Sequence, residues 1–332
     1  MSFSSSHLLF FFTLLLGTFL SISSSSWFGA WVGLELNLLS FIPIISLKNN
    51  QYSSEAALKY FLIQALGSSI IILSASFVLI KSFSANLILS IALLLKAGAA
   101  PFHFWFPSVM EGLQWSQAAI LMTIQKIAPL SLLSYLDSSC YLILLGAIIL
   151  SATIGAIGGI NQTLLRKIMA YSSINHMAWM IVAMMISETS WLFYFLFYSF
   201  LASSIAILFN IQDAFHISHI FNHTSASPQI KILTFMSLLS LGGLPPFSGF
   251  IPKWFIIQEL ISTNLFFILL VLLSSALFTL YYYLRIAISA LMLSSPKTKW
   301  TMKQLHLSFI NPFFMFLNFT GLLAPSLFVM FL

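Results

Sequence analysis

Four charged residues lie deep inside apolar stretches of the sequence and are of types that can carry protons. They are Glu35, Lys96, Lys126 and Lys253. A charge at the middle of a bilayer costs about 2.5 to 3.5 kcal/mol on insertion scales, so each of these side chains needs a reason to be there. Three lysines and one glutamate cannot all pair one to one, and burial of an unpaired ammonium favours its neutral form. We therefore expect a proton relay; the alternatives are structural ion pairs and lysines whose charged ends reach a lipid headgroup.

Histidines offer one further candidate. His176 lies near the middle of an apolar run, and imidazole can pass protons near neutral pH. Two interpretations stay open for it: a further relay residue or a hydrogen-bonded structural residue. His216, His219 and His223 share a helical face by spacing, but their segment is polar and lacks a cysteine. We expect a solvated loop there and no metal site.

The composition indicates what surrounds these residues. Of 332 residues, 60% are hydrophobic and only 6% are charged, where a soluble domain carries about 25% charged residues. Eleven apolar runs of membrane-spanning length follow one another with short polar interruptions, and nothing remains for a domain outside the membrane. The sequence predicts an all-α polytopic membrane protein with one transmembrane domain over 1–332 and spans at about 5–24, 27–46, 55–80, 86–106, 114–136, 140–159, 164–187, 189–210, 230–262, 264–290 and 308–331.

Several absences narrow the function. One cysteine, Cys140, excludes disulfides, cysteine-ligated iron–sulfur clusters and tetrathiolate zinc. The sequence has no dinucleotide or Walker motif, and His176 has no evident histidine partner for haem. The lysines are scattered between apolar runs, which argues against nucleic-acid binding. We expect no cofactor and no metal in this chain.

Two apolar runs carry the same interruption. Pro101 and Pro107 are six residues apart after a Gly-Ala-Ala triplet, and Pro246 and Pro252 are six apart after two glycines. Paired glycine- and proline-interrupted spans indicate inverted repeats with discontinuous helices, although proline kinks are common in membrane helices. The expected repeats are approximately 5–136 and 140–290, followed by a last helix at 308–331.

The basic residues predict the orientation. An odd number of spans puts the two termini on opposite sides of the membrane, and basic residues concentrate on the cytoplasmic or matrix side. Only Lys81 falls on the side opposite the N-terminus. The N-terminal side holds Lys48, Arg166, Lys167, Lys231, Lys297, Lys299 and Lys303. We expect the N-terminus in the cytoplasm or mitochondrial matrix.

Six segments of the sequence carry recognisable motifs: Trp31 to Pro43, Glu55 to Phe61, Lys96 to Trp105, Gln125 to Pro129, Gly158 to His176 and Gly242 to Trp254. They closely resemble the antiporter-like membrane-arm subunits of mitochondrial respiratory complex I, the NADH:ubiquinone oxidoreductase, with an arthropod-like pattern. The resemblance covers about residues 27–262.

The resemblance implies a fold and a mechanism. It implies two inverted five-helix repeats with one broken helix each, and proton translocation coupled to NADH oxidation and ubiquinone reduction. Glu35 and Lys96 would interact beside one half-channel, Lys126 would be the central relay lysine, and Lys253 would lie towards the exit. NADH, FMN, iron–sulfur clusters and ubiquinone would belong to other parts of the complex. The partners would be neighbouring antiporter-like subunits and lipid, and the location the inner mitochondrial membrane, with the N-terminus in the matrix and the C-terminus in the intermembrane space.

Two rival functions stay open at this point. A free-standing monovalent cation:proton antiporter would use the same fold and lysines. A structural spacer, whose charges only hold helices together, would need Lys126 for assembly and not for turnover.

Overall fold

A computed structural model describes residues 5–46, 50–79, 84–136, 140–222 and 228–292. Within these ranges the chain is almost wholly helical, and the protein is an all-α membrane protein. The predicted span 308–331 and five of the basic residues used for orientation lie outside the described residues, as does His223. The basic residues concerned are Lys48, Lys81, Lys297, Lys299 and Lys303.

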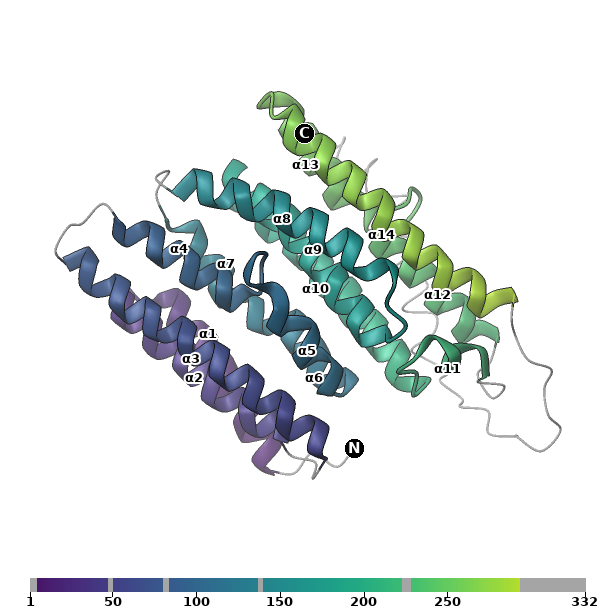
Figure 1. The fold of residues 1–332 in the computed structure, drawn as a ribbon, viewed down its shortest axis with the longest axis horizontal. Coiled ribbons are helices and arrows are strands. Elements are labelled where there is room, and N and C mark those ends of the chain that lie inside the picture. Colours follow the sequence, from purple (N-terminus) through teal and green to yellow (C-terminus); the bar gives the residue numbers. More distant parts are fainter. Residues whose placement is uncertain (1–4, 47–49, 80–83, 137–139, 223–227, 293–332) are drawn as a thin grey trace. The chain divides into compact units, whose positions relative to one another are not determined.

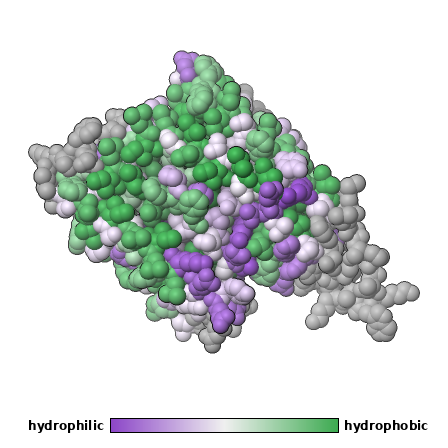
Figure 2. All heavy atoms as spheres, viewed as in Figure 1, coloured by the Kyte–Doolittle hydropathy of each residue, from purple (hydrophilic) through white to green (hydrophobic). Residues whose placement is uncertain are grey.

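Helices of membrane-spanning length dominate the described part of the chain, where eight segments are long and apolar enough to cross a membrane. Large apolar side chains such as Phe12, Phe19 and Leu277 are exposed on them, and most of the surface in Figure 2 is apolar. Serine hydroxyls on these helices donate to carbonyls one turn earlier, as Ser74 does to Ile71 at 2.7 Å. In lipid every polar group needs such an internal partner. The expected number of eleven spans is not confirmed.

The first compact unit covers Met1–Ser151. Its long helices run side by side, α1 against α2, α2 against α3, and α3 against α4 (Figure 1). Its elements are α1 (Ser5–Ser23), α2 (Trp27–Ser46), α3 (Gln51–Leu79), α4 (Ser84–Ala97), the 3₁₀ turn η1 (Phe102–Phe104), α5 (Trp105–Gly112), α6 (Trp115–Met122), α7 (Ile124–Ser134) and the start of α8 (Tyr141–Ile160).

The α1–α2 crossing is very close. A Cβ atom added at Gly17 would lie 2.8 Å from the backbone nitrogen of Asn37, and one added at Gly33 would lie 2.5 Å from the backbone nitrogen of Ser21. Small residues let membrane helices approach backbone to backbone. The crossing therefore fixes the position of α2, which carries Glu35, along its axis relative to α1.

The interruption predicted near Pro101 is present. Helix α4 ends at Ala97, and Gly98 has a φ of +75°. The amide of Gly98 donates to Leu95 O at 3.2 Å and that of Ala99 donates to Leu94 O at 3.1 Å. These two bonds form a Schellman motif, which needs a left-handed residue after the helix. The chain resumes as α5, and the Trp105 indole donates back to Leu95 O at 3.0 Å.

The second unit, Ala152–Leu332, contains the matching interruption. Helix α12 ends at Gly242, and Gly243 has a φ of +78°. The Gly243 amide donates to Ser240 O at 3.0 Å, and the Leu244 amide donates to Leu239 O at 3.4 Å. The two discontinuous helices expected from the sequence are thus confirmed, and they stop by the same motif.

The described helices of this unit also run side by side, with α9 against α10, α10 against α12, and α12 against α14 (Figure 1). The polar loop expected around His216 contains the short helix α11. The elements are the end of α8, α9 (Leu165–Ile186), α10 (Glu188–Ile211), α11 (Ile217–Asn222), α12 (Pro228–Gly242), α13 (Phe250–Ser262) and α14 (Phe266–Met292).

The span predicted at 114–136 differs from the expectation, because it is divided at Thr123. This residue has φ −113° and ψ −81°, and its hydroxyl donates to Ala119 O at 2.7 Å. Pro129 follows in α7; because proline has no N–H, the carbonyl four residues earlier, that of Gln125, loses its usual helical donor. The Thr123 hydroxyl, which competes for a carbonyl, and a proline six residues later together weaken this stretch of helix.

Candidate functional site

Lys96 lies at the end of the first half-helix and is buried. It is in the last turn of α4 with 5% of its surface exposed. Its charge interacts with that of Glu35, which is half-buried on α2. A cation is favoured here because the carbonyls at a helix C-terminus carry a partial negative charge. Glu35 is thus within electrostatic reach of Lys96, and their direct pairing stays a prediction from the resemblance.

Lys126 is more deeply buried, at 2% exposure, and it lies in the first turn of α7, just after the division at Thr123. Its Nζ lies 5.0 Å from the centroid of the Phe106 ring on α5. An ammonium over an aromatic face gains electrostatic stabilisation from the ring. Its backbone amide donates to Thr123 O at 3.0 Å, three residues back.

A small cavity connects these lysines. Lys96 and Lys126 both line it, together with Asn37, Tyr60 and Gln125 among other residues. Its volume, about 10 Å³ as the space open to the centre of a water molecule, is close to the minimum for one water. Water with several polar partners is as good a hydrogen-bonding group as a side chain. The cavity therefore has room for about one water molecule beside both lysine residues.

Lys253 belongs to the second unit and is also buried, at 6% exposure. It lies in the first turn of α13, and its Nζ donates to the carbonyl of Gly242 at 2.8 Å. It also lies 5.8 Å from the centroid of the Trp179 ring on α9. The ammonium thus satisfies the last carbonyl of the half-helix α12, on the far side of the interruption.

His176 is buried on α9 in the same unit. A 2.8 Å hydrogen bond joins its Nδ1 to the Tyr194 hydroxyl on α10, and its ring is 5.0 Å from that of Tyr198. Tyr194 also stacks on Trp179, with ring centroids 6.3 Å apart. His176 therefore shares a set of aromatic neighbours with Lys253.

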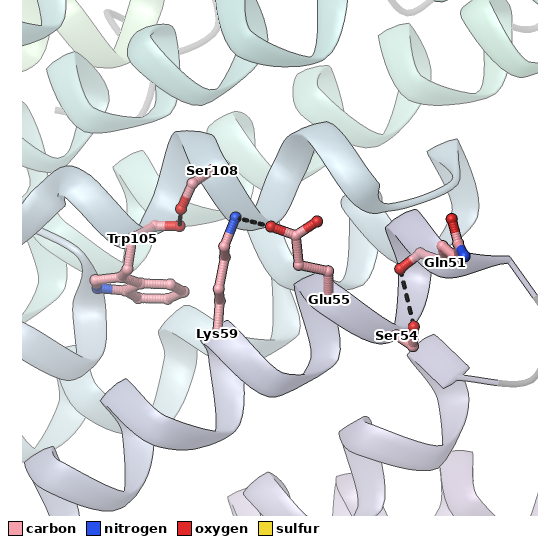
Figure 3. Close-up of polar contacts among 6 residues, drawn as sticks. All are labelled: Gln51, Ser54, Glu55, Lys59, Trp105 and Ser108. Atoms are coloured by element: carbon pink, nitrogen blue, oxygen red, sulfur yellow. Dashed lines mark hydrogen bonds and ion pairs between the residues drawn. The ribbon is translucent and has the colours of Figure 1, made fainter.

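An exposed lysine provides a contrast within the first unit. Lys59 forms a 2.6 Å ion pair with Glu55 one turn earlier on α3, and the two side chains are 46% and 61% exposed. Figure 3 shows the ammonium and the carboxylate directed at each other, with Trp105 and Ser108 on α5 nearby. Such pairs contribute about 0 to 1 kcal/mol because water or salt screens them.

Sequence reasoning missed a hydrogen-bonded network beside the cavity. The Tyr60 hydroxyl donates to Gln125 Oε1 at 3.1 Å, and Gln125 Nε2 donates to Asn37 Oδ1 at 2.8 Å. These residues come from α3, α7 and α2. The spacing of Tyr60 and Gln64, four residues apart in an apolar run, indicates a polar face on α3 but not the bonds to Gln125 and Asn37.

The structure has two interrupted helices with buried lysines beside them, and the first of these helices also lies next to a water-sized cavity. These features define a class of antiporter-like membrane subunits. Comparison with known protein families supports this class. The family described as NADH:quinone oxidoreductase/Mrp antiporter, transmembrane, matches residues 24–87 and 79–279.

Curated relatives narrow the class. The chain is 50% identical to NADH-ubiquinone oxidoreductase chain 2 of Anopheles gambiae, with 96% of each chain covered. It is 50% identical to the protein of that name from Aedes aegypti, with 88% of each covered. The chain therefore belongs to the NADH-ubiquinone oxidoreductase chain 2 family.

A solved structure supports the fold. A chain of respiratory complex I from Thermus thermophilus with bound aureothin matches at a TM-score of 0.86 and 23% identity. The match covers 98% of this chain and 80% of that one. The antiporter-like fold predicted from the resemblance is thus confirmed.

Proposed function

We propose that this chain is a core membrane-arm subunit of respiratory complex I that couples NADH oxidation and ubiquinone reduction to proton translocation. The observation that carries the proposal is the water-sized cavity lined by both Lys96 and Lys126, with Glu35 in electrostatic reach of Lys96. Two buried amines joined through water can exchange a proton without any redox group. NADH, FMN, the iron–sulfur clusters and ubiquinone then act in other subunits of the complex.

The relay that we propose runs from Glu35 and Lys96 to Lys126 and then to Lys253. A charge change in a neighbouring membrane-arm subunit alters the pairing of Glu35 with Lys96. Lys126 then accepts a proton and later passes one towards Lys253. His176 is proposed as a further relay residue in the second unit, supported by its hydrogen bond to Tyr194.

The setting of this relay is part of the proposal. We place the chain in the inner mitochondrial membrane, with the N-terminus in the matrix and the C-terminus in the intermembrane space. We also propose that 5–136 and 140–290 are inverted repeats. The presence of one interrupted helix in each half, ending at Ala97 and at Gly242, supports this proposal.

The first experiment asks which assembly contains the chain. Source membranes are run on a mild-detergent native gel, stained for NADH oxidation, and each band is searched for peptides of this chain by mass spectrometry. We expect the peptides in a large NADH-oxidising band. Peptides found only near 37.1 kDa would indicate a free-standing antiporter, which liposome flux assays would then test.

The second experiment is Lys126→Met in the assembled complex. Losing a proton-transfer group typically costs at least about hundredfold in that step, so we expect NADH-driven proton pumping to fall strongly. Normal assembly with an unchanged rate and unchanged protons per electron would rule out the relay role. Loss of assembly with normal turnover in the remaining complex would favour the structural spacer.

A further inference from the structure

The network of Asn37, Gln125 and Tyr60 has no part in the relay described above. Its three side chains come from three helices, and Asn37 and Tyr60 are almost fully buried. Buried polar groups persist where their hydrogen bonds are satisfied, and such networks fix one arrangement of the surrounding helices. The Gln125 amide is held at both ends, since Oε1 accepts from Tyr60 and Nε2 donates to Asn37.

Because of its position in α7, Gln125 can hold the helical turn that carries Lys126. Gln125 lies between the division at Thr123 and Lys126, in the first turn of α7. The first turn of a helix has amides without partners in that helix, so other contacts must hold it. The bond to Asn37 ties this turn to α2, two residues from Glu35, and the bond to Tyr60 ties it to α3.

The same three residues line the cavity between Lys96 and Lys126. A water there needs two to four polar partners. The lysine amines and the side chains of this network supply partners of both kinds, donors and acceptors.

We propose that Gln125 is a positioning residue for proton transfer between Lys96 and Lys126, acting through its bonds to Asn37 and Tyr60. The amide holds the turn that carries Lys126 and orients water in the cavity. In the transfer, the Lys96 ammonium gives a proton to water while that water gives one to the neutral Lys126 amine. One proton moves, water is regenerated, and Gln125 neither gains nor loses a proton. This inference rests on the proposed relay.

The test compares Gln125→Met with Lys126→Met in the assembled complex reconstituted into liposomes. Methionine keeps the length of glutamine and removes both hydrogen bonds. Small misplacement of a reacting group costs rate, so we expect turnover to fall roughly tenfold and the H₂O/D₂O rate ratio to rise, because proton transfer becomes the slow step. A merely structural role would lower the amount of complex and leave this ratio unchanged.

The matched control is Ser131→Ala on the same helix. Ser131 is buried, and its hydroxyl bonds only locally to Ala128 O at 2.9 Å in the contacts described. We expect its turnover and isotope ratio to match those of the unsubstituted complex.

The outcomes separate the two proposals. A slowed Lys126→Met complex beside a Gln125→Met complex with unchanged rate and isotope ratio overturns the role of Gln125 alone. An unaffected Lys126→Met complex overturns the relay itself. If Gln125→Met fails to assemble, Tyr60→Phe decides, because it removes one hydroxyl and keeps the ring. A lower rate with a raised isotope ratio supports the positioning role, and unchanged values overturn it.

Discussion

The Lys253 ammonium donates to the carbonyl of Gly242 across the interruption of the second discontinuous helix, at 2.8 Å. In the first interruption the order is reversed, because Lys96 precedes Gly98 and lies within the half-helix that ends there. Each half-helix thus ends beside a buried cation, which the partial negative charge of its last carbonyls favours. Lys253 thus reaches the end of its half-helix from beyond the break, whereas Lys96 lies in the last turn of its own half-helix.

Lys253→Met should reduce both stability and turnover. It leaves the Gly242 carbonyl without its donor, which costs about 1 to 3 kcal/mol for a buried group, and it removes a proposed proton carrier. Thermal stability of the complex on native gels and NADH-driven pumping measure the two effects. Lys59→Met is the matched control, because Lys59 is exposed and its ion pair is screened. Equal pumping by the two variants would argue against a relay role for Lys253.

Gly243→Ala should be damaging while Gly242→Ala is tolerated. Alanine at Gly243 must adopt a φ of +78°, which costs about 1 to 2 kcal/mol, and its Cβ would lie 2.7 Å from Lys253 Cδ. At Gly242 the nearest atom would lie 3.5 Å away, an ordinary contact. Assembly and pumping per assembled complex are the measurements. Similar behaviour of the two variants would mean that the motif tolerates rearrangement.

The variant His176→Gln should distinguish a relay role of His176 from a structural role. Glutamine can keep a hydrogen bond to the Tyr194 hydroxyl but cannot titrate near neutral pH. If His176 carries protons, pumping should fall by roughly tenfold. This loss is smaller than the one typical of an essential acid–base group, because water provides a second route for the proton. Tyr194→Phe keeps the imidazole and should have the smaller effect on pumping. Normal pumping by His176→Gln would leave the residue with a structural role.

The two helix interruptions were predictable because glycine and proline act locally. Gly98 and Gly243 permit the left-handed turn, and the prolines that follow repeat at the same spacing. The division at Thr123 was not predicted, because a threonine and a single proline are ordinary in membrane helices. The division depends on which backbone carbonyl accepts the hydrogen bond from the Thr123 hydroxyl.

Burial of the three lysines followed from their position in apolar runs, but their neighbours did not. The partners of Gln125 lie 65 and 88 residues away in the sequence, and only the folded arrangement of the helices brings them together. The charges indicated Glu35 and Lys96 as candidates, and the resemblance implied that they pair. The neutral amide of Gln125 gave no such indication.

The close approach of α1 and α2 constrains which sequence changes the molecule tolerates. On the exposed sides of these helices, where Phe12 and Phe19 lie at the surface, many apolar residues would serve equally well. At Gly17 even one methyl group would press on the backbone of Asn37 and move α2 along with Glu35. A substitution of Gly17 by a larger uncharged residue, in a helix that carries no charge, would then be inherited as a defect in proton coupling. Genetic surveys should therefore rank substitutions at Gly17 as being as damaging as those at the buried lysines.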